Sequence, residues 1–226
     1  MKSKSKIQLM SDHTNAPLSR ATLYYIHDPM CSWCWAFRPV WLQLKEALFE
    51  EINIINTLGG LAPDSDQPMP ADLQKTLQAI WGSIQHKVPN TQFNFNFWST
   101  CQPRRSTYPA CRAVIAAMQQ GKQFEEPMIL AIQQAYYLQA QNPSDESTLA
   151  TLAKNIGLNV SQFIQQLNAD ETQRQLDDQI IFNHSIDAKS FPSLVLIADD
   201  KPYPIKIDYL HVNNMLKQIN EILQKA

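Results

Sequence analysis

The chain has 226 residues, of which 44% are hydrophobic and 18% charged, and this length and apolar content are enough to bury a core of its own. Its 19 basic and 21 acidic side chains give a formal net charge of −2, which excludes the strongly basic surface of most nucleic-acid-binding proteins. No apolar run approaches the ~20 residues that a membrane-spanning helix needs. We therefore expect a soluble globular protein with neither nucleic acid nor a membrane as its partner.

The first twenty residues differ in character from the rest. Residues 1–20 carry four basic side chains but no apolar stretch of the ~7–15 residues that a secretory signal needs. We interpret this segment as a flexible tail and expect a cytoplasmic protein. In that compartment structural disulfides are rare, and a Cys-x-x-Cys pair is more often catalytic or metal-binding.

A β-α-β unit is predicted directly after this tail. The β-branched and aromatic run Thr22–His27 ends at Asp28-Pro29 and predicts a buried strand. Apolar residues at helical spacing predict a helix over residues 34–50, and residues 52–58 predict a second strand that Gly59-Gly60 closes.

The middle of the chain carries only helical patterns, and the strand pattern returns near its end. Between Pro63 and Ile186 we predict helices over residues 73–84, 109–120, 125–141, 145–156, 161–167 and 171–182. After them, strands over 193–198 and 203–207, joined by a turn at 199–202, predict an antiparallel hairpin, and a last helix follows over 211–224.

These patterns predict an α/β fold in which one domain is interrupted by another. The strands fall in residues 21–62 and 187–226, and an all-helical insertion domain separates these two parts over residues 63–186.

Two cysteines lie where the first helix is predicted to begin, in Cys31-Ser32-Trp33-Cys34. At this spacing the two sulfurs can approach disulfide distance. Unpaired backbone N–H groups and the positive end of the helix dipole favour the thiolate of the first cysteine. We predict that Cys31 is the catalytic nucleophile. Cys34, one turn deeper, is predicted to be a protonated thiol that resolves a mixed disulfide between Cys31 and a substrate.

Four segments within residues 22–207 resemble one family: DPMCSWCWAFRPVW, LGGLAPDSDQPMP, PRRSTYPACRAV and SFPSLVL. They are similar to the DsbA branch of the thioredoxin superfamily, and most similar to its predicted cytoplasmic protein-disulfide isomerases, which are related to FrnE and to 2-hydroxychromene-2-carboxylate isomerases. The resemblance implies a thioredoxin-like fold interrupted by a helical insertion. It also places Cys31 and Cys34 on the redox pair of the family.

The resemblance further implies residues that position the substrate. Pro192 falls on the proline that follows a cis peptide bond opposite the redox pair. We therefore predict that the Phe191-Pro192 bond is cis, that it contacts the Cys31 sulfur, and that the free N–H and C=O of Phe191 align a substrate chain by main-chain pairing. Trp33, between the cysteines, is expected to be partly exposed at the same site.

Three features depart from the family. Phe191 replaces the smaller residue that often precedes the cis-proline, which suggests an apolar contact with the substrate. The Ser32-Trp33 dipeptide differs from those of the best-known relatives, so no redox potential can be transferred. The strand TLYYIH also has no acidic residue where many relatives bury one, which leaves the group that deprotonates Cys34 open. We interpret His27 as a packed strand residue, although its place near Cys31 leaves a tuning role open.

The cysteines also allow other interpretations. A zinc site would need Cys101 and Cys111 as further ligands, but their spacing is wider than in typical zinc modules and no histidine is near either one. A papain-like protease would pair the CSWCW segment with His184, but no Gln precedes Cys31 to build an oxyanion hole. Cys101 and Cys111 could form a second redox pair, and we favour inert thiols.

The predicted function is thiol–disulfide exchange on protein or peptide disulfides, as a reductase or isomerase, with neither an organic cofactor nor a metal. Glutathione is a candidate partner. One alternative is a glutathione-dependent transferase or isomerase of the kappa or 2-hydroxychromene-2-carboxylate isomerase type, which usually carries Ser at the nucleophile position. Another is a redox-inert module that binds partners in an apolar groove. The sequence leaves the substrate, the redox potential, the electron donor and the oligomeric state open.

Overall fold

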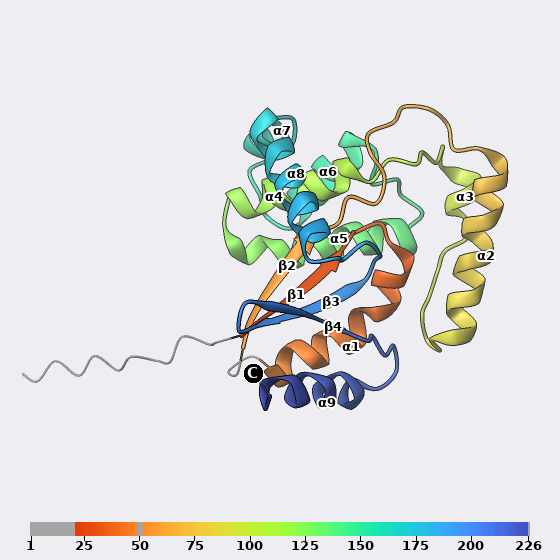
Figure 1. The fold of residues 1–226 in the computed structure, drawn as a ribbon. Helices are drawn as coiled ribbons and strands as arrows, with labels where there is room; N and C mark the ends of the chain where they lie inside the picture. The colour runs from red at the N-terminus through yellow and green to blue at the C-terminus, as the bar shows by residue number, and fades with distance from the viewer. Residues whose placement is uncertain (1–20, 49–51, 226) are drawn as a thin grey trace, which may run out of the picture.

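A four-stranded sheet lies at the centre of the structure, a computed structural model that describes residues 21–48 and 52–225 (Figure 1). The predicted tail of residues 1–20 lies outside the described residues. The strand order is β2-β1-β3-β4, and the strands are β1 (Ala21–His27), β2 (Asn53–Leu58), β3 (Ser193–Ala198) and β4 (Lys201–Ile205). Strand β1 runs parallel to β2 and antiparallel to β3, and β4 is antiparallel to β3. The predicted β-α-β unit and hairpin therefore share one sheet.

Alternate side chains of β1 point to opposite faces of this sheet, as expected for a strand buried on both sides. Leu23 and Tyr25 pack in one core with α1 (Ser32–Leu48) and α9 (Val212–Leu223). Tyr24 and Ile26 lie in the other core, where Phe182 of α8 (Asp170–Ser185) contacts Tyr24 at a ring-centroid distance of 4.8 Å. The sheet is thus covered by α1 and α9 on one face and by α8 on the other.

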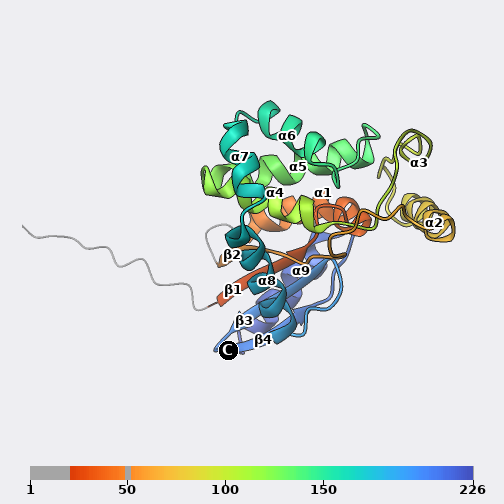
Figure 2. The ribbon, with the colours of Figure 1, turned by 90° about the horizontal axis from the view of Figure 1, so that it is seen from above.

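The helices between β2 and β3 form a further hydrophobic core. Besides α8, they are α2 (Ala71–Lys87), α3 (Phe97–Thr100), α4 (Tyr108–Gln119), α5 (Glu125–Tyr137), α6 (Glu146–Asn155) and α7 (Val160–Leu167), with a 3₁₀ turn at Lys122–Phe124. Figure 2 shows α4 to α7 gathered together, with α2 and α3 set apart at one end. These elements form the predicted α/β fold with a helical insertion, whereas the domain boundaries at 62 and 187 stay a prediction. In the part of the chain that the structure describes, no helix is both long and apolar enough to cross a membrane.

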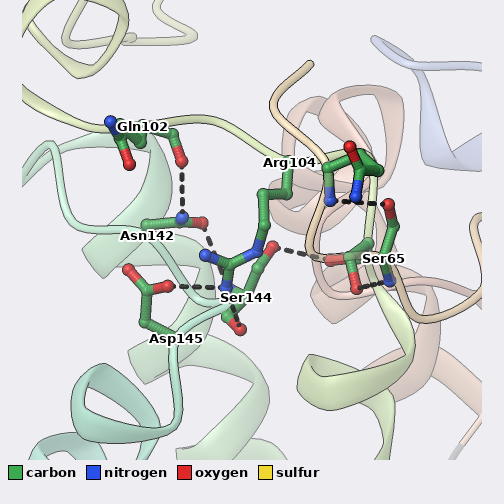
Figure 3. Close-up of polar contacts among 8 residues, drawn as sticks. Ser65, Gln102, Arg104, Asn142, Ser144 and Asp145 are labelled. Carbon is green, nitrogen blue, oxygen red and sulfur yellow. Dashed lines mark hydrogen bonds and ion pairs between the residues drawn. The ribbon is translucent and has the colours of Figure 1, made fainter.

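Polar contacts hold two loops of the insertion together (Figure 3). Arg104 donates to the carboxylate of Asp145 at 2.6 Å and to the backbone oxygen of Ser144 at 2.7 Å. The side-chain amide of Asn142 donates to the Gln102 oxygen at 3.2 Å. The loop before α4 is thereby fixed to the loop before α6.

The structure differs from the predicted boundaries at the hairpin and at the end of α5, among other places. The hairpin turn contains only Asp199 and Asp200, with φ of 46° and 58°, so β4 begins at Lys201 and ends at Ile205. Positive φ at both central residues is the pattern of a two-residue type I′ turn. The helix predicted over 125–141 ends at Tyr137, because the backbone and side-chain amides of Asn94 pair with the oxygens of Tyr137 and Leu138.

Helix α8 is joined to the sheet by buried hydrogen bonds. The hydroxyl of Thr57 donates to Oδ1 of Asn183 at 2.7 Å, and Nδ2 of Asn183 donates to the Leu58 oxygen at 2.9 Å. A second side chain of the helix, Gln179, accepts from the Leu58 N–H at 2.7 Å. Since Asn183 is only 1% exposed, its amide has no water to replace these partners.

Replacing Asn183 with Ala is expected to lower the free energy of unfolding by about 2 kcal/mol, because it leaves the Thr57 hydroxyl and the Leu58 oxygen buried and unpaired. Urea denaturation followed by circular dichroism measures the change. Ile181→Ala, on the same helix at a residue 66% exposed, is the control and should change stability by less than about 0.5 kcal/mol. Equal unfolding midpoints for the two variants would contradict this account.

Candidate active site

The turn between β1 and α1 places the two cysteines at the carboxyl end of β1. The Cys31 N–H donates to the Asp28 oxygen at 3.0 Å, and the Cys31 oxygen accepts the first helical bond, from the Trp35 N–H at 3.0 Å. Cys31 therefore stands at the N-cap of α1, with Cys34 inside the first turn. Cys31 is 6% exposed and Cys34 is 0% exposed, so Cys31 carries the outer thiol and Cys34 the inner one.

The loop before β3 brings Phe191-Pro192 to this pair. The peptide bond is cis, and the Cys31 thiol donates to the Phe191 oxygen at 3.4 Å across 160 residues of sequence. Both the cis bond and the contact agree with the prediction. The expectation of a free Phe191 oxygen is wrong for this dithiol form, because the Cys31 thiol occupies that oxygen. The Phe191 ring covers Gly59, where an added Cβ would clash with it.

A buried carboxylate supports the turn, and the sequence analysis missed its role. Asp28 is 0% exposed and accepts from the N–H groups of Met30 and Leu61, both at 2.8 Å, and from the Thr107 hydroxyl at 2.6 Å. Burial raises the pKa of this carboxyl, while the hydrogen bonds oppose the rise. An Asp that bonds the N–H two residues on is typical of a turn, and the sequence pattern indicated only the end of a strand.

The inner thiol is held in its protonated form. Burial raises the pKa of the Cys34 thiol well above its usual value, and hydrogen bonding with Cys31 raises it further. A buried thiol without charge compensation is a weak nucleophile until its proton is removed. This agrees with the predicted resolving role.

Three tyrosines surround the two sulfurs. They come from β1 (Tyr25), α5 (Tyr137) and the segment after β4 (Tyr209). Burial raises the pKa of each phenol, and the nearby cysteines add to the rise. For Tyr25, hydrogen bonding with Cys34 adds further to the rise in the pKa. All three are therefore neutral hydroxyl groups at neutral pH.

Residues 24–218 match the thioredoxin family. The chain belongs to this family. That match includes the cysteine turn, the helical insertion and the Phe191-Pro192 loop, and it confirms the resemblance seen in the sequence at the level of the superfamily. The relation to the FrnE branch stays a prediction.

Curated relatives of this thioredoxin-family chain include the ClpXP adapter protein SpxH of Bacillus subtilis, 24% identical over 185 residues, or 80% of this chain. SpxH of Halalkalibacterium halodurans is 24% identical over 182 residues. The chain spans 59% of the length of these two relatives.

Solved structures with the same fold include a Nitrosomonas europaea protein provisionally assigned as a protein disulfide isomerase. Its TM-score is 0.79 at 24% identity, over 91% of this chain and 98% of that one. The cytosolic disulfide reductase DsbM of Pseudomonas aeruginosa has a TM-score of 0.71 at 20% identity, over 91% of this chain and 100% of its own. A structure of DsbM with GSH has a TM-score of 0.69 at 20% identity, over 90% of this chain and 99% of that one. At these identities the likeness shows the fold.

An apolar groove borders the cysteine turn of this thioredoxin-family site. Trp33 is half-buried, as expected, and meets the edge of Tyr209 at 5.1 Å and the ammonium of Lys87 at 5.6 Å, both measured to the ring centroid. Beside it lies a cavity of about 550 Å³, lined by Trp35, Pro39, Leu42, Leu138, Tyr209 and Leu210. Because Tyr209 contacts Trp33 and also lines this cavity, the groove begins next to the redox pair.

The other two cysteines have separate partners. The Cys101 thiol donates to the Ala140 oxygen at 3.0 Å, and the Cys111 thiol donates to the Asp28 carboxylate at 3.4 Å. Burial raises the pKa of both thiols. All four cysteines lie in the described residues and are free thiols. Over residues 21–48 and 52–225, no cluster of three or more His, Cys, Asp or Glu side chains could hold a metal ion.

In the reduced protein at neutral pH, Cys31 should react with iodoacetamide at least about tenfold faster than Cys34, Cys101 or Cys111. The reason is that Cys31 stands at the helix N-terminus, whereas burial keeps the other thiols protonated. A time course with mass mapping of each cysteine measures the order. Faster labelling of Cys34 or Cys111 would overturn the assignment of outer and inner thiols.

Proposed function

We propose that the protein catalyses thiol–disulfide exchange on protein or peptide disulfides, with Cys31 as the attacking thiol and Cys34 as the resolving thiol. The observation that carries this proposal is the 3.4 Å contact between the Cys31 sulfur and the Phe191 oxygen. It sets the outer sulfur beside a backbone that can pair with an extended chain.

The reaction needs only the two thiols. The Cys31 thiolate attacks one sulfur of a substrate disulfide, the substrate S–S bond breaks, and the other substrate sulfur leaves as a thiolate. Cys34 then loses its proton and attacks the Cys31 sulfur, which releases the second substrate thiol. The substrate gains two electrons, and the protein ends as a Cys31–Cys34 disulfide. In isomerisation a substrate cysteine replaces Cys34 in the second step, and the protein returns to the dithiol.

The surroundings support a peptide substrate. When Cys31 enters a mixed disulfide it no longer carries a thiol proton, so the Phe191 oxygen becomes able to accept a substrate N–H. Trp33 and the apolar groove next to it suit apolar side chains that flank the substrate cysteine. Phe191, Pro192 and Trp33 are thus proposed to position the substrate.

A dithiol in a reducing compartment begins reduced, so we propose reduction or isomerisation in the cytoplasm rather than net oxidation. The structure of cytosolic DsbM with GSH supports glutathione as the candidate electron donor. Two glutathione molecules would return the Cys31–Cys34 disulfide to the dithiol and leave as glutathione disulfide. A kappa-type transferase is less well supported, because its usual Ser is replaced by Cys31 and a second thiol follows at Cys34.

A second candidate function is binding without redox turnover, as an adapter. The observation in its favour is the name of the curated relatives, ClpXP adapter protein SpxH. An adapter that uses the apolar groove would keep its partner affinity when Cys31 and Cys34 are both replaced by Ser. An exchange enzyme would lose all turnover in that double variant.

Cys31→Ser should reduce disulfide-reductase activity to background in an insulin-reduction assay, since no nucleophile remains. Cys34→Ser should keep the first step and accumulate mixed disulfides, because only resolution is lost. Non-reducing gels and mass spectrometry detect these adducts. Cys101→Ser is the control and should retain activity. Full activity of Cys31→Ser would reject the mechanism.

A further inference from the structure

A small cavity, the His27 cavity, lies between the sheet and helices α1 and α5. Its volume is about 10 Å³, and its lining includes Tyr25, His27, Trp41, Asn56, Glu126 and Gln133. These residues come from β1, β2, α1 and α5, so the cavity lies where the helical insertion meets the thioredoxin-like sheet. A volume of this size admits about one water molecule.

Buried polar atoms without a partner surround the His27 cavity. Within the ranges that the structure describes, no group pairs with Nδ1 and Nε2 of His27, Nε1 of Trp41, or Oδ1 of Asn56. Such atoms cost stability unless something bonds to them. Burial lowers the pKa of His27 to about 4, so at neutral pH the imidazole offers one donor and one acceptor. A water molecule offers two donors and two acceptors, so it can pair with the unpaired polar atoms around the cavity.

One residue that lines the His27 cavity, Tyr25, is also a neighbour of the resolving thiol. Tyr25 lines the cavity and stacks on His27, with ring centroids 4.9 Å apart and planes at 8°. Tyr25 is also close enough to Cys34 for that thiol to add to the rise in the pKa of the phenol, after burial. Cys34 itself is 0% exposed, so its proton cannot pass directly to solvent. Tyr25 is therefore the neighbour of Cys34 that also reaches the cavity.

The outer end of the His27 cavity is a charged cluster. Glu126 lines the cavity, and its side chain is 28% exposed. It forms ion pairs with Arg38 at 3.3 Å and Lys45 at 3.1 Å. These cations hold the pKa of Glu126 below its usual value despite partial burial. Glu126 is thus a carboxylate that touches both the cavity and solvent.

We propose that the His27 cavity binds one water molecule and that Tyr25, this water and Glu126 carry the Cys34 proton to solvent during resolution. The inference rests on the proposed exchange reaction. The Tyr25 oxygen takes the Cys34 proton while its own hydroxyl proton passes to the water, and a proton of the water passes through Glu126 to solvent. The Cys34 electron pair forms the bond to the Cys31 sulfur, and the substrate sulfur leaves with the pair from the broken S–S bond. His27 holds the water in place.

The test uses the reduced full-length protein and 5,5′-dithiobis(2-nitrobenzoic acid) in a stopped-flow absorbance experiment. Attack by Cys31 releases one nitrothiobenzoate ion, and resolution by Cys34 releases a second. Tyr25→Phe, which removes only the hydroxyl, should leave the first phase unchanged and slow the second at least about tenfold, since a hydrogen bond to a developing charge is lost. Glu126→Gln should slow the same phase.

Two neighbouring residues supply matched controls. Tyr24→Phe removes a hydroxyl from the opposite face of β1, and Glu125→Gln neutralises the adjacent carboxylate of α5, which does not line the cavity. Both should keep the wild-type rate of the second phase. Wild-type second phases in Tyr25→Phe and Glu126→Gln would overturn the proton route. If Tyr25→Phe does not fold, the rate of the second phase in Glu126→Gln alone decides whether the proton route holds.

The water site has a readout that does not depend on activity. In wild-type protein, the Trp41 indole N–H should show a nuclear Overhauser effect to a long-lived water, and His27→Phe, which fills the site, should abolish it. No such effect would refute the water site. If wild-type protein releases no second nitrothiobenzoate ion while Trp41 still contacts water, the exchange function and the route fail and the water site stands.

Discussion

The buried carboxylate of Asp28 joins three segments that are distant in sequence. It bonds the turn that leads into α1 through Met30, the loop after β2 through Leu61, and the start of α4 through Thr107. A carboxyl buried among four donors, the fourth being the Cys111 thiol, stays in one place, because any shift leaves a donor or an oxygen unpaired. The burial of each cysteine depends on this interaction. So does the position of the helical insertion on the sheet.

The turn between β1 and α1 places the two cysteine side chains in different surroundings, and this gives them different roles. Cys31 begins the helix and meets the Phe191 oxygen, whereas Cys34 lies a turn deeper, with burial raising its thiol pKa. The tyrosines around them are neutral and add no charge of their own, so the helix terminus, burial and hydrogen bonds govern the reactivity of the pair. The apolar groove beside Trp33 gives the same site a surface suited to a peptide chain.

Local pattern was enough to predict most of the fold. Runs of β-branched and aromatic residues and helical spacing predicted the elements at both ends of the chain, and the Cys31–Cys34 spacing indicated the site, to which the family resemblance added Pro192. The missed features depend on contacts between distant segments: Asn94 ends α5 from a loop, and Thr107 gives Asp28 its buried role. No periodicity in sequence encodes such pairings. The same holds for the His27 cavity, whose polar groups come from four elements.

The most direct test of the central claim, that Cys31 and Cys34 form a reversible dithiol–disulfide couple, is an equilibrium titration in glutathione redox buffers. Acid-quenched samples are alkylated and analysed by mass spectrometry. We expect one two-electron transition confined to Cys31 and Cys34, with a midpoint in the range of about −270 to −120 mV spanned by thioredoxin-like proteins, and no such transition in Cys34→Ser. A pair that stays a dithiol at every buffer ratio, or a transition that involves Cys101 and Cys111 instead, would contradict it.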